Sequence, residues 1–565
     1  MDTLLLIGLV VSGYFGITIL IGILFSRHIK SSGDYYKGGS VIPWWAAGLS
    51  QYMAGFSSYS FVVVAGVIYA KGAFGVLWAL IGPVSILIGA RLFSHLWHRS
   101  GITTPIEFLE ERFSGGMKQF FAWMGILSRP LSNGVRLAAF GILISALLGF
   151  GMSDILNGSI PVPVMVVVIG GLVVCAYTLL GGLFGAVVTD VLQFIILQTA
   201  LIPLFVLCYI EVGGIGGFIA QTPSGFLAMP GLESTEWLWL FAWCVIFFCD
   251  YNAGQWGLIT RYICTKSERD ARKVGLLAGI LYLPMTILVM FPILVARMLN
   301  PEIHPESSFG WIIQEVFPPG MVAIMLAAMF AATLSTISAE LNTLSGVFTV
   351  DVYKRFFHPM ATEGNLVLAG RVMTMLIGIS TIAISIVILL WANSILSVAQ
   401  EMATYLVLPS STVFLLGLMT WKTGTKGALS ALVSGIIFGW LGKIIALKMG
   451  WEGNIVIFFQ NGLAVFVTAG LFFAVGTLFP QKGDLAKRAQ NFRKRLGQRS
   501  VEQLTEVNSS FPAPLRIVGI SVVLIAVMLL ATLLHPSNFD GTIVIASTGG
   551  ILLFGGLILC RANKV

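Results

Sequence analysis

Three apolar segments of the sequence are interrupted by side chains that carry oxygen. The segment 320–350 contains Ser335 and Thr336, whose hydroxyls can point at the same spot as a carbonyl three residues earlier. Hydroxyl oxygens, together with carbonyl oxygens freed by an unwound helix, suit a hard monovalent cation. No group of His, Cys and carboxylate residues has the spacing of a transition-metal site. Small and polar residues also interrupt two other segments: Ser50, Ala54, Gly55, Ser57, Ser58 and Ser60 in 43–70, and Asp250, Asn252, Gly254 and Gln255 in 236–260.

Two ionisable residues, Arg136 and Asp250, lie where an apolar segment would cross a membrane. Charges at this depth are costly, and they indicate a substrate site, an ion path or an internal ion pair. The Arg136 guanidinium could hold both oxygens of a substrate carboxylate, or it could pair with Asp250 or Glu340. Asp250 could equally bind a substrate amine or a proton. The six His residues lie outside the helix centres, so the sequence predicts that the protein is not an enzyme.

The composition identifies the elements that must position these residues as membrane helices. Of the 565 residues, 57% are hydrophobic and 10% are charged, whereas soluble domains carry about 25% charged residues. The apolar residues recur in runs of about 20, the length that crosses a hydrocarbon layer of about 30 Å. Backbone in lipid must satisfy its own hydrogen bonds, so these runs are predicted to be helices. We expect an all-α polytopic membrane protein with about fifteen transmembrane helices, near residues 3–25, 43–70, 74–97, 119–149, 161–181, 184–210, 236–260, 274–299, 320–350, 367–391, 396–420, 426–447, 454–479, 515–534 and 541–560.

The basic residues predict how these helices are oriented. With the N-terminus outside, 27 of the 33 Lys and Arg residues fall in cytoplasmic segments, as the positive-inside rule requires. The sequence therefore predicts a multi-pass protein of the cell (inner) membrane, with the N-terminus outside and the C-terminus in the cytoplasm. The net charge of +8 sets topology in this arrangement and does not indicate nucleic-acid binding.

The order of the interrupted segments predicts an internal repeat. The segments 43–70 and 236–260 begin two consecutive five-helix sets, 43–211 and 236–420. Because five is odd, the second set must have the opposite orientation in the membrane. Transporters built from such inverted repeats place broken helices at matching positions of the two halves, around a site at mid-membrane. The rest of the chain is predicted to form an extra N-terminal helix with the cytoplasmic loop that leads into the core (1–42), two further helices (421–480), a basic cytoplasmic loop (481–514) and a two-helix C-terminal tail (515–565).

Several motifs resemble the sodium:solute symporter family, to which sodium/glucose, sodium/proline and sodium/sialic acid cotransporters belong. The segment from Tyr177 to Gln193 is similar to the most diagnostic stretch of the family, Gly-Gly through Thr-Asp and Gln. The other matches occur in order between residues 30 and 440: Tyr35–Ser40 with Pro43–Ser50, Arg261 with the charged loop ending at Arg272, 331–338 through 351–355, and Gly417–Leu418 with Gly427–Ala428. The resemblance implies a sodium-coupled carrier whose first and sixth core helices are broken.

The resemblance also implies a sodium site between the first and eighth core helices. By position, three carbonyls and two hydroxyls would bind the ion, those of Met53, Phe56, Ala332, Ser335 and Thr336. Some members have a second sodium site, for which Asp190 and Ser338 are the candidates here. Ala339 stands where a further hydroxyl is expected, which favours one sodium ion per cycle. Asp190 is then either a sodium ligand or a structural group.

We therefore predict a symporter that works by alternating access and couples sodium influx to uptake of a small solute, which could bear a carboxylate. The solute is expected beside the broken helices, where the candidate contacts are Ser57, Ser60, Arg136, Asp250, Asn252, Gln255 and Trp256. Two alternatives remain open on this fold: a transport-linked sensor that signals through the C-terminal region, and a proton-coupled carrier. The loop 481–514 could dock a regulatory partner or anionic lipid, or it could be a solvated loop.

Overall fold

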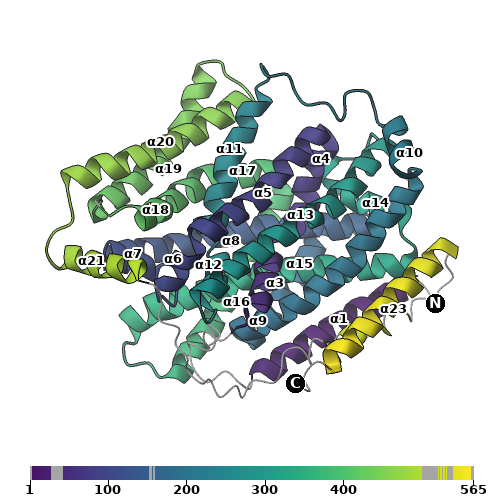
Figure 1. The fold of residues 1–565 in the computed structure, drawn as a ribbon, viewed down its shortest axis with the longest axis horizontal. Coiled ribbons are helices and arrows are strands. Elements are labelled where there is room, and N and C mark those ends of the chain that lie inside the picture. Colours follow the sequence, from purple (N-terminus) through teal and green to yellow (C-terminus); the bar gives the residue numbers. More distant parts are fainter. Residues whose placement is uncertain are drawn as a thin grey trace.

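The protein is seen here in a computed structural model, which describes residues 3–26, 42–151, 155–156, 160–392, 394–421, 423–498, 519–520, 522–524, 526–527, 530 and 539–561. The segment 35–40 and most of the predicted helix 515–534 lie outside the described residues. The described part is a bundle of helices (Figure 1), with two short antiparallel strands, β1 (Ile155–Leu156) and β2 (Ile160–Pro161). The predicted all-α architecture is confirmed.

The two predicted five-helix sets form the centre of the bundle. The first set comprises α3 (Trp44–Gly55) with η2 (Ser60–Val64) and α4 (Ala65–Lys71), then α5 (Ala73–Leu92), α8 (Gly115–Leu147) and α9 (Val162–Glu211), which covers both the fourth and the fifth predicted helix of this set. The second comprises α11 (Glu236–Cys249) with η3 (Asp250–Gly254) and α12 (Trp256–Ile263), then α13 (Glu268–Leu299), α15 (Pro319–Gly346) with η5 (Val347–Phe357), α16 (Glu363–Trp391), and α17 (Ile395–Met402) with η6 (Ala403–Val407) and α18 (Leu408–Met419).

Shorter and peripheral elements connect and surround this core. The short helices are α6 (Ser94–Arg99), α7 (Glu107–Arg112), α10 (Gly214–Gln221), η4 (Pro305–Ser307) and α14 (Ser308–Val316). The peripheral helices are α1 (Thr3–Ser26), α19 (Thr425–Lys448), α20 (Asn454–Leu478), α21 (Gly483–Gly497) and α23 (Phe539–Arg561). Helices α19 and α20 contact each other and α18, whereas α1 and α23 contact α9 (Figure 1).

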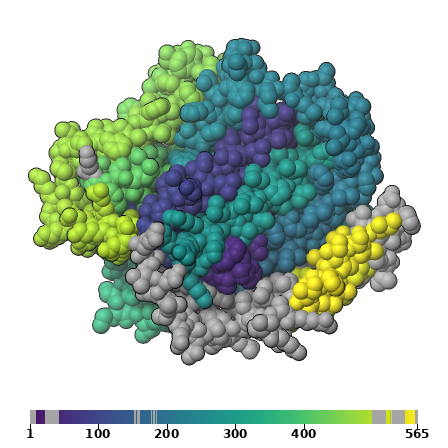
Figure 2. Space-filling model, in the orientation of Figure 1, coloured from purple at the N-terminus to yellow at the C-terminus, as the bar shows by residue number. Residues whose placement is uncertain are grey.

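The described residues contain ten helices that are long and apolar enough to cross a membrane, or eleven if the bent α3–α4 pair is one span. Three shorter apolar stretches, Leu9–Ile21, Val162–Ala176 and Ala546–Ile558, match further predicted runs. The runs 161–181 and 184–210, which we predict as two helices, form the single helical element α9 of 50 residues. Large apolar side chains of α5, such as Val84, Ile88 and Leu92, are exposed, as side chains in contact with lipid would be. Figure 2 shows the segment that contains them at the surface.

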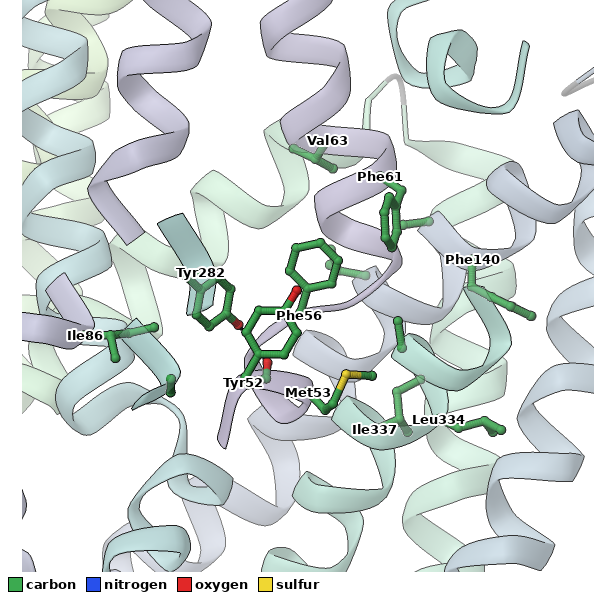
Figure 3. Close-up of a cluster of buried hydrophobic side chains, with 14 of the residues drawn as sticks. Tyr52, Met53, Phe56, Phe61, Val63, Ile86, Phe140, Tyr282, Leu334 and Ile337 are labelled. Carbon is green, nitrogen blue, oxygen red and sulfur yellow. Dashed lines mark hydrogen bonds between the residues drawn. The ribbon is translucent and has the colours of Figure 1, made fainter. Parts of the chain in front are cut away.

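The first core helix is broken between α3 and η2. Helix α3 ends at Gly55 and Phe56 is extended (φ −109°, ψ 116°), so that the two halves are bent by 58°. Glycine is required at position 55, because a Cβ there would lie 2.4 Å from the Tyr282 hydroxyl oxygen. The rings of Tyr52, Phe56 and Tyr282 gather at the break, and the Met53 side chain points toward α15 (Figure 3). Since the last four carbonyls of a helix lack intrahelical partners, the break makes those of α3 available.

The sixth core helix is broken at the matching position. Helix α11 continues into the π-helical turn η3, Gln255 is extended (φ −90°, ψ 99°), and α12 begins at Trp256. Gly254 precedes the break, and a Cβ on Gly254 would lie 2.4 Å from Asp250 Oδ1. Both predicted breaks are therefore present in the structure. Helix α15 passes beside them, and its most apolar stretch is buried along its full length.

Candidate functional site

Carbonyl oxygens from the broken first core helix converge on one hydroxyl of α15. Thr336 Oγ1 lies 3.2 Å from the Met53 carbonyl oxygen, 3.1 Å from that of Phe56 and 3.2 Å from that of Ala332. Ser335 is the neighbouring residue and, like Thr336, is buried. The structure thus brings Met53, Phe56, Ala332 and Thr336 into one cluster, with Ser335 beside it.

This cluster gathers more oxygen lone pairs than the Thr336 hydroxyl can use. A threonine hydroxyl carries one hydrogen and can donate it to one acceptor, yet three carbonyl oxygens lie within 3.2 Å of Thr336 Oγ1. The Met53 carbonyl also accepts the Phe56 N–H at 3.3 Å and the Ala332 carbonyl lies within α15, but each carbonyl oxygen has a second lone pair. A small cation could bind these lone pairs together with those of the hydroxyl, because hard cations take oxygen ligands. The donor set therefore fits a monovalent cation such as sodium.

Asp190 lies at the centre of a buried polar network next to this cluster. Its Oδ1 accepts a 2.6 Å hydrogen bond from the Ser335 hydroxyl, and its Oδ2 accepts one of 2.5 Å from Ser50. Arg261 Nη2 lies 3.6 Å from Asp190 Oδ2, and Arg261 Nε donates to Ser50 Oγ. Asp190 and Arg261 are both fully buried. The network ties α3, α9, α12 and α15 together.

The candidates for a second cation site are arranged differently. Ser338 donates its hydroxyl to the Ser335 carbonyl oxygen at 3.1 Å. The Asp190 carboxylate faces the Arg261 guanidinium, which supplies a positive charge in place of an ion. This arrangement favours the structural interpretation of Asp190 over a second sodium site.

A cavity of about 140 Å³ opens on the α4 side of the two breaks. It is lined by the broken helices and by α5, α8, α13, α17 and η6. Five of the predicted solute contacts line it: Ser57, Ser60, Arg136, Asp250 and Gln255. The wall is otherwise apolar and aromatic, as in most small-molecule sites.

One basic and one acidic side chain line the cavity, Arg136 of α8 and Asp250 of η3. Arg136 of α8 donates a 3.2 Å hydrogen bond from Nη1 to the Asn133 side-chain oxygen, and it makes no ion pair within 4.0 Å among the described residues. Asp250 Oδ2 accepts a 2.6 Å hydrogen bond from Gln255 Nε2. Arg136 forms no ion pair within 4.0 Å with Asp250 or Glu340; Asp250 bonds to Gln255 instead, and Glu340 lies 3.8 Å from Arg129. A solute with a carboxylate, or with opposite charges at its two ends, is complementary to this wall.

Two predicted solute contacts, Asn252 and Trp256, do not line the cavity. The Asn252 amide donates to the carbonyl oxygens of Ser85 and Phe248, at 3.2 and 2.8 Å, and so holds η3 against α5. The buried Trp256 ring lies on the far side of the break, under the Arg129 guanidinium. In a helix, Asn252 lies about 200° around the axis from Asp250, because the two residues are two positions apart. This angle could have indicated from the sequence that their side chains face different surroundings.

The structure adds cavity residues that the sequence analysis did not select. Tyr251, Tyr282 and Thr286 line the cavity. Tyr282 also donates from its hydroxyl to the Tyr52 carbonyl oxygen at 3.0 Å, so it braces α3 from α13. Tyr282 and Thr286 belong to α13, a helix with no break and no polar cluster, and only the packing of α13 against α3 brings them to the site.

Within the part of the chain that the structure describes, no three His, Cys, Asp or Glu side chains are grouped so that they could hold a metal ion. The oxygen cluster around Thr336 is built instead from neutral carbonyls and hydroxyls. Such neutral donors match a monovalent ion, whose charge needs less compensation than that of a divalent one.

Comparison with known proteins agrees with this geometry. Residues 35–435 match the model of the sodium:solute symporter family. A sodium/sialic acid symporter from Aliivibrio fischeri is 27% identical over 441 residues, covering 75% of this chain and 85% of the relative. A sodium/glucose cotransporter from Vibrio parahaemolyticus is 27% identical over 477 residues, covering 77% and 84%.

Solved structures confirm the predicted inverted-repeat fold. The structure of a Na⁺-coupled sialic acid symporter in a substrate-bound, outward-open state aligns with a TM-score of 0.70 at 22% identity, covering 85% of this chain and all of that one. A nucleobase-cation-symport-1 family transporter in a closed conformation aligns with a TM-score of 0.51 at 12% identity. The five-plus-five core with two broken helices is thus the shared architecture.

Proposed function

The chain belongs to the sodium:solute symporter family and is a sodium-coupled symporter, and we propose that it takes up a carboxylate-bearing solute by alternating access. The observation that carries the proposal is Arg136, which lines the cavity beside the broken helices and has no counter-ion within 4.0 Å among the described residues. A partly buried guanidinium without a counter-ion has lost part of its hydration, and a carboxylate can satisfy it with two parallel hydrogen bonds. Asp250 also lines the cavity and adds a contact for an amine, so amino acids and amino sugars with a carboxylate are included.

We propose that sodium binds to the carbonyls of Met53, Phe56 and Ala332 and to the hydroxyls of Ser335 and Thr336. Met53 belongs to α3, Phe56 to the break that follows it, and the other three residues to α15, so the five groups come from two different five-helix sets. An ion between them would pull the two sets together on the α3 side. This closure accounts for coupling, because the ion stabilises the state in which the cavity is open on the α4 side. The gradient then supplies about 2.3 kcal/mol per charge per 100 mV, plus the concentration term.

The test of this function is solute-dependent stabilisation followed by sodium-driven uptake. The purified protein is heated with matched pairs of metabolites, each a carboxylate and its neutral counterpart, with and without sodium. We expect the carboxylates to raise the melting temperature in sodium and to do so less in potassium. In proteoliposomes the same compounds should then accumulate only when a sodium gradient is imposed.

Two results would contradict the proposal. Equal stabilisation by the neutral counterparts removes the carboxylate assignment. Uptake that responds to an acid pH outside and not to sodium indicates a proton-coupled carrier. The charge moved per solute in the same vesicles gives the stoichiometry, for which the Asp190–Arg261 pair favours one sodium ion.

We further propose that α21 lies in the cytoplasm with the C-terminus, and that the residues near Ser307 lie outside. The exposed Lys487, Lys494 and Arg495 of α21 support this orientation through the positive-inside rule. Single cysteines placed at Lys494 and near Ser307 should react with a membrane-impermeant reagent from opposite faces of oriented vesicles. Labelling of both from one face contradicts the proposed topology.

The predicted cytoplasmic loop 481–514 contains the helix α21, and its residues 499–514 lie outside the described residues. The position of α21 supports our proposal of a regulatory surface there. Phe492 is buried against Phe108 and Trp421, and Arg495 lies 3.3 Å from Glu111 of α7. Arg99 of α6 donates to the Leu496 carbonyl oxygen at 2.9 Å. A partner that binds the basic face of α21 would therefore act on α6 and α7, the short helices between α5 and α8.

A further inference from the structure

A cluster of charged and aromatic side chains closes the α12 side of the site, away from the cavity. The carbon at the centre of the Arg129 guanidinium lies 4.4 Å from the centre of the Trp256 ring. Arg129 Nη1 is also 3.8 Å from Glu340 Oε2 of α15. Glu340 Oε1 accepts a 3.0 Å hydrogen bond from the Gly257 N–H. The cluster therefore joins the first turn of α12 to α8 and α15.

The sequence around the cluster permits this close approach. A Cβ on Gly125 of α8 would lie 2.5 Å from the Trp256 ring, so only glycine leaves room for the indole. A Cβ on Gly257 would lie 3.2 Å from Glu340 Oε1. The first N–H groups of a helix have no intrahelical partner. In α12 one of them, the Gly257 N–H, donates to the Glu340 carboxylate. Below this contact, Ala54, Leu258 and Ala339 form a small apolar cluster that joins α3, α12 and α15.

The position of Arg129 relates the cluster to the cavity. Arg129 and Arg136 are seven residues apart on α8, which is about two turns on nearly the same face, or about 10 Å. Arg136 lines the cavity, whereas Arg129 is covered by the buried Trp256. A solute that leaves the cavity toward α12 along this face of α8 must therefore pass the Trp256 ring.

We propose that Arg129, Trp256 and Glu340 form the gate that holds α12 closed against α8 and α15. The inference deepens the alternating-access function proposed above and rests on it. Opening would break the contact between Arg129 and the Trp256 ring and the Gly257–Glu340 hydrogen bond. Arg129 and Glu340 belong to α8 and α15, so each keeps the other as counter-ion after α12 moves away. Because neither charge is then left buried and unpaired, which would be costly, the gate can open without a large penalty.

The chain contains a matched ion pair that does not touch α12. Lys118 Nζ lies 2.8 Å from Asp351 Oδ1, and Asp351 is buried. Lys118 belongs to α8 and Asp351 to η5, the continuation of α15. This pair joins the same two helices as Arg129 and Glu340, so it controls for a general loss of packing between them.

The test measures how often the α12 side opens. Ala339→Cys is introduced as a reporter into a variant whose six native cysteines are replaced, and its reaction with a membrane-impermeant thiol reagent is timed. Trp256→Ala should raise the rate about thirtyfold, since a desolvated cation–π contact contributes about 2 kcal/mol and each 1.4 kcal/mol is a factor of about ten, whereas Trp256→Phe, which keeps a ring, should leave it nearly unchanged. Glu340→Gln should raise the rate severalfold, and Asp351→Asn should not.

Two results would overturn the gate. One is an unchanged rate in Trp256→Ala, and the other is an equal rise in Glu340→Gln and Asp351→Asn. Sodium provides the separate check on the underlying function, because it should slow the reaction of the reporter in the otherwise unaltered protein. If sodium has no effect in any variant while Trp256→Ala still accelerates labelling, the sodium-dependent closure proposed above fails and the gate stands.

Discussion

Replacing Ser335 and Thr336 together by alanine should raise the sodium concentration for half-maximal uptake about tenfold or more. Thr336 Oγ1 is the hydroxyl around which the carbonyls of Met53, Phe56 and Ala332 gather. Hydrogen bonds and contacts to charged groups contribute about 1.5–3 kcal/mol each, and each 1.4 kcal/mol corresponds to a factor of about ten in affinity. The measurement is initial uptake rate in proteoliposomes as a function of external sodium.

The conservative and control variants separate ion binding from packing. Thr336→Ser keeps the hydroxyl and should retain most of the sodium affinity. Thr343 and Ser345 of α15 are buried hydroxyl residues that donate to backbone carbonyls on their own helix, at 2.8 and 2.9 Å. Their double alanine variant should leave the sodium dependence unchanged. If the Ser335 and Thr336 double variant folds and also shows an unchanged dependence, the sodium assignment is wrong.

The Ser335 variant must be interpreted separately in this experiment, because the Ser335 hydroxyl also donates a hydrogen bond to Asp190. Its loss removes one of the two hydroxyl donors to a carboxylate that is fully buried. Ser335→Ala is therefore expected to lower the melting temperature as well as the sodium affinity, whereas Thr336→Ala should act mainly on sodium. A thermal unfolding measurement in the absence of sodium distinguishes the two effects.

Replacing Arg136 by glutamine should lower the affinity for a carboxylate solute about a hundredfold, and replacing it by lysine should lower it less, about tenfold. Lysine keeps the charge but lacks the planar fork that holds both carboxylate oxygens. Glutamine removes the charge altogether. The measurement is binding of the carboxylate that stabilises the native protein best, with the melting temperature of each variant as the check on folding.

A variant of Asp250, the acidic residue that lines the cavity, complements the Arg136 variants. Asp250→Asn should weaken binding of a solute that also carries an amine and should leave binding of a simple organic acid nearly unchanged. Arg112→Gln is the control for loss of a buried arginine, because Arg112 bonds to the carbonyls of Gly417 and Thr420 and does not line the cavity. Unchanged binding in a folded Arg136→Gln variant would make Arg136 structural and remove the carboxylate inference.

Arg129 and Arg136 illustrate why two arginines in one apolar helix can have different roles. Arg129 is satisfied by Glu340 and by the face of the Trp256 ring. Arg136 has the Asn133 side-chain oxygen as an acceptor but no counter-ion among the described residues. The protein has thus neutralised one charge internally and left the other facing a cavity. This asymmetry is the physical basis for assigning the solute contact to Arg136 and the gate to Arg129.

The sequence by itself determined which segments cross the membrane, where two of them break and which residues near the breaks carry oxygen. Apolar runs of sufficient length are helices because lipid offers no partner for the backbone. A glycine stands at each break, Gly55 and Gly254, and a Cβ at either position would lie 2.4 Å from a side-chain oxygen, that of Tyr282 or Asp250. The oxygen cluster around Thr336 could be anticipated from the adjacent hydroxyls of Ser335 and Thr336, and its other members by position from the resemblance to the family.

Only the tertiary structure decided which polar side chains share the cavity. The rotation of each helix about its axis is set by its neighbours, so Tyr282 and Thr286 of α13 reach the site although nothing in their own segment marks them. The π-helical turn η3 adds a residue to one turn and brings Gln255 back to Asp250, with the Gln255 N–H donating to the Asp250 carbonyl oxygen at 2.8 Å. Asn252, within the same turn, faces α5 instead. Local periodicity contains no information about such pairings, because they depend on which helices pack together and at what rotation.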